Sequence, residues 1–484
     1  MALDGDVLFA PVAALSARIL DRALSPVALA EAYLERVARW QPAVNAFVTV
    51  TAERALADAR AAESDLAAGR WRGPLHGIPY ALEDVVDTRG IRTTLGARPY
   101  ADRVPDRDAT VAARLAAAGG VLLGKLSTIE LGGGLGYRTG AAALGGPCRN
   151  PWDASRWAGG SSSGPAAAVA AGLVPCAIAA GAGGSIASPA AWCGATGVRP
   201  TYGAISRAGV MPVAYTLDRV AAVARSAEDC ALVLAAVAGL DPRDPSSAAP
   251  PRGIDRVRSD MPRGLRVAVL APGADASPTA RAAFDAACGV LQKAGTILEE
   301  ATLPDLPWSA VALLVERAEA ANAFEELIRS GRTRELADPS HASRRPEDYA
   351  PAAGAADYVR AMRLRAEMQR ALAGFFSRHD VVLAPAALRP APRADEEIQG
   401  QDAGPLGAAV AVAGLPAVSL PVGFDGGLPV GAQLVGPPFE DARLLAVAAW
   451  FQARTRWHLK TPPEPAAPPA PASPPAAPPP VARR

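Results

Sequence analysis

Segments with the pattern of helices alternate along this chain with short, mostly apolar runs that are typical of strands. The helix signals begin at Ser25-Pro26, Thr51, Asp108, Ser226 and Ser277-Pro278. The apolar runs lie at 78–86, 121–123, 265–271 and 417–435, the last broken by the turn Asp425-Gly426-Gly427. Such alternation predicts an α/β architecture.

The ends of several helices are marked by residues that cap them. Ser25 and Ser277 each precede a proline, the arrangement of an N-cap followed by a first helical residue. Asp108 is expected to cap a helix over 109–118, and Ser226 with Asp229 resembles a capping box for a helix that runs to Gly239. We expect the helix from Ser25 to end near Trp40 and the helix from Thr51 to end at Gly69.

Three longer stretches stand out by composition. Residues 157–198 contain no charge, but they are rich in Gly, Ala and Ser and include Pro175, so we expect buried core rather than a membrane span. Residues 308–380 are predicted to be mostly helical, with a polar, Arg-rich break near 330–350. From 461 to 484 the chain is mostly Pro and Ala, which predicts a disordered tail after one domain at 1–460.

The overall charge gives no reason to expect nucleic acid or a membrane as a partner. The chain has 484 residues with 49 basic and 48 acidic side chains, and half of all residues are hydrophobic. Its first ten residues lack the basic-then-apolar layout of a signal peptide, so a cytoplasmic location is expected. Five cysteines and four histidines are scattered without a C-x-x-C pair, which predicts reduced, buried thiols and no zinc site.

Candidate chemistry is concentrated in glycine-rich segments that carry serines. Gly159-Gly160 precede Ser161, Ser162 and Ser163, and Gly183-Gly184 precede Ser185. Glycine pairs before serines are typical of tight turns that expose hydroxyls and aim backbone N–H groups at a ligand, as an oxyanion hole requires. Taken alone, either segment is more typical of a loop or a close-packed turn than of a catalytic site, and no histidine lies near them to complete a conventional triad.

In their order and spacing these segments resemble the amidase-signature family. The resemblance covers roughly residues 5–455 and includes GPLHGIP at 73–79, GKLSTIE at 124–130, NPWD at 150–153, GGSS at 159–162, GGSI at 183–186, RPTYG at 199–203, GLPAVSLPVGF at 414–424 and LPVGAQLVG at 428–436. It implies an α/β/α fold around a large, mostly parallel, twisted mixed sheet. It also implies hydrolysis of carboxamides and some esters through a Ser–cis-Ser–Lys triad without cofactor, and thus a small-molecule amide or ester substrate. A homodimer is common among such proteins.

The resemblance assigns roles to individual residues. Ser185 matches the nucleophile, Ser161 the bridging serine at an unusual cis peptide, and Ser162 a supporting hydroxyl. The backbone amides of Ala182, Gly183, Gly184 and Ser185 match the oxyanion hole. Variable segments at 126–145 and 315–375 are expected to shape the substrate pocket.

The chain departs from the family pattern at the same place. The family motif GIPxxxKD ends here in Glu83-Asp84, so Glu83 stands where the triad lysine is expected, and Lys125 matches a different lysine of the family. Gly181 and Ala187 stand where the family's TDTGGSIR motif has Asp and Arg. Ser163 replaces a glycine and is followed closely by Pro165. Together these changes make the formal charge of the expected site more negative, which would oppose an oxyanion.

Two functions therefore remain open from the sequence. The retained serines and glycines favour a hydrolase with a modified site in which Glu83, its pKa raised by burial, acts as the base. The lost residues favour a pseudo-amidase that keeps the fold as a binding protein or as part of a complex.

Overall fold

The computed structural model describes residues 5–274, 276–349, 354–398 and 404–465. Most of the predicted tail, from residue 466 onward, therefore lies outside the described residues. Within them, no helix is both long and apolar enough to cross a membrane.

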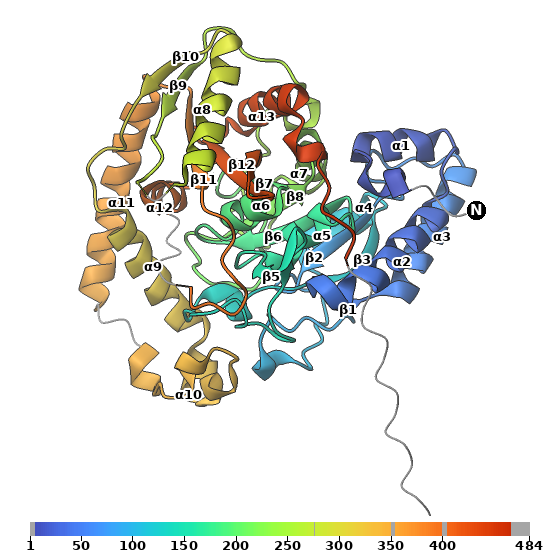
Figure 1. Ribbon diagram of the computed structural model, residues 1–484. Coiled ribbons are helices and arrows are strands. Elements are labelled where there is room, and N and C mark those ends of the chain that lie inside the picture. Colours follow the sequence, from blue (N-terminus) through green and yellow to red (C-terminus); the bar gives the residue numbers. More distant parts are fainter. Residues whose placement is uncertain (1–4, 275, 350–353, 399–403, 466–484) are drawn as a thin grey trace, which may run out of the picture.

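One large sheet runs through the molecule (Figure 1). Its strands lie in the order β1-β3-β2-β6-β8-β7-β12-β13-β11-β9-β10. Their bounds are β1 Phe47–Val50, β2 Pro79–Glu83, β3 Val121–Leu126, β6 Cys176–Gly181, β7 Thr196–Arg199, β8 Arg219–Ala224, β9 Arg266–Val269, β10 Ile297–Glu300, β11 Val381–Ala387, β12 Ala417–Asp425 and β13 Leu428–Val435. A separate two-stranded sheet joins β4 Arg149–Asn150 to β5 Asp153–Trp157.

The large mixed sheet is confirmed, but the expectation that it is mostly parallel is wrong. Among the described strand pairs, four are parallel and six are antiparallel. The predicted hairpin explains part of this, because β12 and β13 are joined at Gly426-Gly427 and a turn this short can connect only antiparallel strands.

Helices pack against strands at both ends of this sheet and against its central strands (Figure 1). Helices α2 and α3 lie beside β3 near one end of the sheet, and α9, α11 and α12 form a group near the opposite end. The bounds are α1 Val12–Leu20, α2 Pro26–Val44, α3 Ala52–Ala67, α4 Thr110–Ala117, α5 Ser163–Ala170, α6 Ala187–Cys193, α7 Ala227–Val237, α8 Pro278–Lys293, α9 Trp308–Ala323, α10 Glu325–Arg329, α11 Ala355–Phe376, α12 Gly404–Ala413 and α13 Asp441–Thr455.

Several predicted caps are present with the expected hydrogen bonds. The Ser25 hydroxyl accepts from the N–H groups of Val27 and Ala28, and the Ser277 hydroxyl accepts from Ala280 N–H at 3.0 Å. Ser226 accepts from Asp229 N–H at 3.0 Å. These caps satisfy N–H groups that the first turn of a helix leaves without partners.

Other predicted boundaries were wrong. Asp108 does not cap α4: its carboxylate accepts from Arg89 N–H at 2.7 Å, and Ala109 occupies the cap position. The helix expected to end near Trp40 continues to Val44 through Pro42. Strand β2 ends at Glu83, three residues earlier than expected.

The uncharged stretch 157–198 forms the centre of the main core, as predicted. It contributes α5, β6, α6 and β7, and all eight residues of α5 are buried. All five cysteines lie in the described part of the chain, and none is paired. No group of three or more His, Cys, Asp or Glu side chains in that part could hold a metal ion.

Candidate active site

The segments that carry the candidate residues meet at one edge of the sheet. Strands β2 and β6 are parallel neighbours, so their carboxyl ends lie side by side. Glu83 is the last residue of β2, and Gly181, the last residue of β6, leads into the turn that ends at Ser185. The carboxyl edge of parallel strands is where α/β proteins place ligands.

Glu83 is fully buried and is held through one of its two oxygens. Its Oε2 accepts from the Ser162 hydroxyl and from Ala180 N–H, both at 2.8 Å. Its Oε1 is buried and accepts no hydrogen bond of standard geometry among the described residues, although the Thr128 hydroxyl is close enough to the carboxylate to favour its ionised form. Burial raises the pKa of Glu83 to about 7, against the opposite effect of the Thr128 and Ser162 hydroxyls and the Ala180 N–H.

Ser161 lies at a cis peptide bond, as the resemblance implies. The Gly160–Ser161 bond is cis, and the Ser161 carbonyl accepts from Ile129 N–H at 3.1 Å and from the Thr128 hydroxyl at 3.2 Å. Its hydroxyl oxygen is buried without a partner in the part of the chain that the structure describes. The expected contact of residue 83 with the bridging serine is thus not formed; the carboxylate is bonded to Ser162 instead.

Ser185 is half-buried and sits close against Gly181. A Cβ added to Gly181 would lie 2.7 Å from Ser185 Cβ and 2.9 Å from its Oγ, closer than real side chains approach. The Ser185 carbonyl accepts from Ser162 N–H at 3.3 Å, which ties the two serine-bearing segments together. A side chain at position 181 would therefore displace Ser185.

Arg199, at the end of β7, holds the turn that leads to Ser185. Its Nη1 donates to the Ala182 carbonyl at 2.8 Å and also to the Gly183 carbonyl. In a planar trans peptide the C=O and the following N–H point in opposite directions. Arg199 therefore turns the N–H groups of Gly183 and Gly184 away from itself, and in the described residues neither group has a protein acceptor.

The sequence had placed Arg199 only within a matching motif, without a role. Its side chain is buried, with no carboxylate bonded to it among the described residues, and burial lowers its pKa to about 10. A guanidinium stays charged at that pKa, so a positive charge lies behind the turn. No local pattern reveals this contact, because Arg199 is 16 residues from Gly183 in sequence.

Positive charge beside the expected site comes from Arg199 and from Arg219, the first residue of β8. Arg219 is the cross-strand partner of Gly181. Its guanidinium is buried and donates to the carbonyls of Leu415 and Val410 at 2.7 and 2.9 Å. Two buried guanidinium groups thus flank β6 and the turn that leads to Ser185. The sequence pattern had shown only which charged residues of the family motif are absent from this segment.

The remaining motif residues have structural partners. Lys125 donates to the Val86 carbonyl and to the Thr93 hydroxyl, and lies 3.9 Å from Asp84 Oδ1; burial lowers its pKa to about 8. Ser163 and Pro165 fall in the first turn of α5, where a proline lacks only an N–H that the helix leaves unused.

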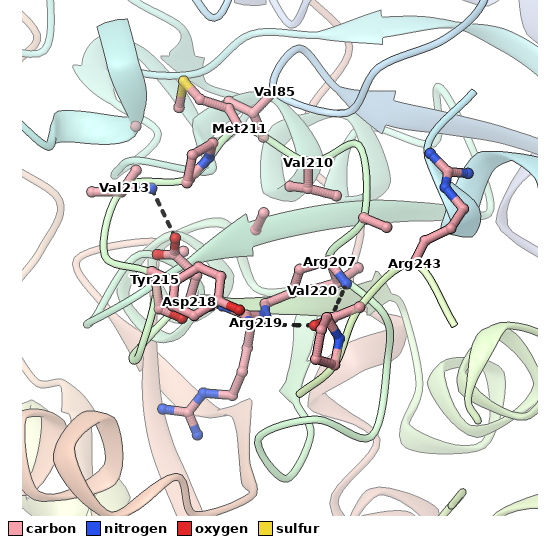
Figure 2. Close-up of a pocket in the computed structure, with 17 residues that line it drawn as sticks. Val85, Arg207, Val210, Met211, Val213, Tyr215, Asp218, Arg219, Val220 and Arg243 are labelled. Atoms are coloured by element: carbon pink, nitrogen blue, oxygen red, sulfur yellow. Dashed lines mark hydrogen bonds and ion pairs between the residues drawn. The ribbon is translucent and has the colours of Figure 1, made fainter. Parts of the chain in front are cut away.

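A cavity of about 210 Å³ adjoins the carboxyl end of β6 (Figure 2). Ala180 and Gly181 form part of its wall, and most of the rest comes from 207–220 and 243–245. A second hollow of about 480 Å³ is lined by residues of α9, by Tyr358 of α11 and by Pro212, Tyr215 and Thr216. Of the segments expected to shape the pocket, 315–375 lines this second hollow, whereas 126–145 contributes only Gly132 to the first.

Comparison with known proteins identifies the class of this chain. The model of the amidase family matches residues 28–445, and the chain belongs to this family of carbon–nitrogen hydrolases. It is 39% identical over 485 residues to the A subunit of the glutamyl-tRNA(Gln) amidotransferase of Methylococcus capsulatus, covering 93% of this chain and 98% of that protein.

Solved structures agree with this assignment. The native peptide amidase of Stenotrophomonas maltophilia is 30% identical, with a TM-score of 0.79 over 94% of this chain and 98% of that one. A structure described as an unexpected vestigial protein complex, which reveals the origins of an s-triazine catabolic enzyme, is 31% identical with a TM-score of 0.83, over 92% of this chain and 98% of that one. Relatives of this chain thus include both an enzyme named as an amidase and a protein named as one subunit of a larger enzyme.

Proposed function

We propose that this protein hydrolyses amide or ester bonds with Ser185 as nucleophile and with Glu83 as the base, in the position of the family's lysine. One observation carries the proposal. Glu83 is anchored through Oε2, while its Oε1 and the Ser161 hydroxyl are both buried and without hydrogen bonds of standard geometry among the described residues. Unpaired buried polar atoms are costly, and active sites are where they persist.

The proposed proton path uses these two open atoms. As Ser185 Oγ attacks the carbonyl carbon, its proton passes to Ser161, and the proton of Ser161 passes to Glu83 Oε1. The protonated Glu83 then returns a proton through Ser161 to the leaving amine or alcohol, which leaves an acyl ester on Ser185. Water attacks that ester by the same route, with Glu83 again as the base.

The pKa of Glu83 suits this role. At about 7, the carboxyl is ionised in a large share of molecules near neutral pH and is still basic enough to hold a proton in the transition state. The contacts from Ser161 to its two neighbours would form when substrate is bound, since catalytic hydrogen bonds are often long or absent without ligand.

An oxyanion can be held by the free N–H groups of the turn. The proposal assigns this role to the backbone amides of Ala182, Gly183, Gly184 and Ser185. Arg199 supports the assignment by fixing the orientation of the 182–184 peptides and by adding a positive charge behind them. Donors that are aimed before the reaction stabilise developing charge without reorganisation.

A second function is favoured by one specific observation. Among the described residues the Glu83 carboxylate accepts from the Ser162 hydroxyl and not from the bridging Ser161, so no hydrogen bond joins the proposed base to the relay. The M. capsulatus relative is named as one subunit of an amidotransferase. The alternative is therefore a pseudo-amidase that serves in a complex or as a binding protein, either inactive or dependent on another chain to close the relay.

Hydrolysis of 4-nitrophenyl esters and anilides by the purified chain separates these functions. The hydrolase predicts that kcat/KM rises with pH with a midpoint near 7, and that Ser185→Ala and Glu83→Gln each remove this activity. A rate equal to that of Ser185→Ala at every pH would support the pseudo-amidase instead. A profile unchanged in Glu83→Gln would remove Glu83 from the mechanism.

A further inference from the structure

The cavity beside β6 is lined mainly by apolar side chains, unlike the polar candidate active site. The two adjoin at Ala180 and Gly181, at the end of β6. We propose that this cavity binds a neutral apolar substituent of the substrate, an aryl or branched alkyl group about the size of a substituted benzene ring. This inference rests on the proposed function, because it names the class of amide or ester that the site accepts. Its substrates would be arylamides, branched alkylamides or the corresponding esters.

The volume of the cavity sets the size of the group. At about 210 Å³ it is somewhat larger than the engineered cavity of roughly 150 Å³ that binds benzene in a protein core. A single ring with one or two further heavy atoms is the occupant that this comparison favours.

The position of the cavity connects it to Ser185. Gly181 lines the cavity, and the same residue lies directly against Ser185. A group held in the cavity would therefore lie beside the strand whose following turn carries the nucleophile. A side chain at position 181 would displace Ser185.

The walls that an occupant would meet are mostly apolar. Figure 2 shows the side chains of Val85, Val210, Met211, Val213 and Val220 around the cavity. Such a surface stabilises an apolar group by removing it from water, at about 25 cal/mol per Å² of buried apolar area.

The charged residues of the wall are already engaged by the protein. Asp218 Oδ2 accepts from the N–H groups of Val213 and Ala214 at 2.8 and 3.0 Å, and its Oδ1 is buried without a partner among the described residues. Arg207 donates to the Tyr215 carbonyl and to the Ser246 hydroxyl, and its guanidinium lies 4.7 Å from the centre of the Tyr215 ring. A charged substituent would lose its hydration against a wall that is mostly apolar, which is costly.

Tyr215 lies between the cavity and the larger hollow. Tyr215 and Pro212 line both the cavity and the larger hollow, and Tyr215 is 56% exposed. In the hollow, the Glu319 carboxylate accepts from the hydroxyls of Thr216 and Tyr358. This carboxylate, in the hollow that shares Tyr215 with the cavity, is a second reason for the site to disfavour anionic substrates.

Binding to a Ser185→Ala protein tests the inference without turnover. 3-Fluorobenzamide and 4-carbamoyl-2-fluorobenzoate, which share the amide but differ by a carboxylate on the far side of the ring, are titrated separately and followed by ¹⁹F NMR. We expect the neutral amide to bind at least about tenfold more tightly than the anion, a difference of about 1.4 kcal/mol. Equal affinity for the two probes, or no binding of the amide at millimolar concentration, would overturn the proposal.

Two variants place the bound ring. Val210→Phe fills the cavity and should weaken amide binding by about tenfold, whereas Val359→Phe, at a 50% exposed position on α11, should change it by less than about twofold. Val210→Ala enlarges the cavity and should shift preference toward 2-naphthamide. Equal effects of the two phenylalanine variants, or an unchanged preference in Val210→Ala, would place the ring elsewhere.

These binding results are independent of catalysis. If the protein binds the neutral amide but never hydrolyses it, the cavity proposal stands and the proposed hydrolase activity is contradicted. A chain that hydrolyses acetyl esters with no preference for aryl groups would keep the hydrolase and defeat the cavity assignment.

Discussion

Replacing Glu83 by Gln should stabilise the protein at alkaline pH. The glutamine keeps the size of the side chain and can still accept from Ser162 and Ala180, which bond to Oε2 in the native chain. What it removes is a carboxyl whose ionised form is penalised by burial. A carboxyl with a raised folded pKa contributes stability that is complete below its unfolded pKa and is lost as pH rises through its folded pKa.

The size of the effect follows from the two pKa values. The pKa of Glu83 moves from an ordinary value of 4.5 to about 7 on folding. At 1.36 kcal/mol for each pH unit, the native chain loses about 3 kcal/mol between pH 4.5 and pH 8, and the variant does not lose this part. For 484 residues at about 2.1 cal/mol/K each, the entropy of unfolding is about 1 kcal/mol/K, so the expected difference in Tm is about 3 °C.

The assay compares thermal unfolding of both proteins at pH 4.5 and pH 8. We expect Tm values that coincide at pH 4.5 and a variant that is about 3 °C more stable at pH 8. Burial also raises the pKa of Asp218 to about 7 and that of Asp229 to about 6, but both residues are present in both proteins, so their effects cancel. Glu367→Gln, at an exposed position on α11, is the matched control and should show no such difference.

One result would refute this reasoning. The result is a Tm difference between Glu83→Gln and the native chain that is the same at pH 4.5 and at pH 8. In that case the carboxylate is ionised at little cost in the folded protein. The pKa would then lie near its ordinary value, and the case for Glu83 as a base near neutral pH would fail.

Three further predictions concern the turn around Ser185. Gly181→Ala should slow the reaction of Ser185 with a fluorophosphonate at least about tenfold, because its Cβ would lie 2.7 Å from Ser185 Cβ. The control is Gly183→Ala, whose Cβ would meet nothing within 4 Å, and equal labelling rates of the two variants would contradict the prediction. Arg199→Gln should lower kcat for ester hydrolysis by about 10- to 100-fold with little change in KM, and Arg199→Lys should recover part of it; a change in KM alone would assign Arg199 to substrate binding. Glu83→Lys alone should not give strong amidase activity on small aryl and alkyl amides, and adding Gly181→Asp should lower the rate further, because a side chain at position 181 would displace Ser185; strong activity of either variant would contradict this.

The sequence was sufficient for features that depend on neighbouring residues. The caps at Ser25, Ser277 and Ser226 bond to N–H groups two or three residues away, so short patterns specify them. The hairpin at 417–435 follows equally from its glycine turn. The approach of the serine segments to residue 83 came from the family resemblance, not from any local pattern.

Features that depend on distant partners could not be predicted. Asp108 had the right position for a cap, but the Arg89 N–H, 19 residues away, took its carboxylate. Glu83 bonds to Ser162 rather than to Ser161, because a carboxylate at the end of β2 also meets the N–H of Ala180 on the neighbouring strand. The contacts of Arg199 and the cavity wall at 207–220 likewise arise only when strands far apart in sequence are paired.

Covalent labelling of Ser185 tests the central claim most directly. The purified protein is incubated with a fluorophosphonate near pH 8, where Glu83 is ionised, and the intact mass and the modified peptide are determined. A single adduct on Ser185 that is absent in Ser185→Ala and at least about tenfold slower in Glu83→Gln is the predicted result. No adduct after long incubation, or an adduct that persists in Ser185→Ala, would contradict a nucleophilic Ser185 and leave the chain as a pseudo-amidase.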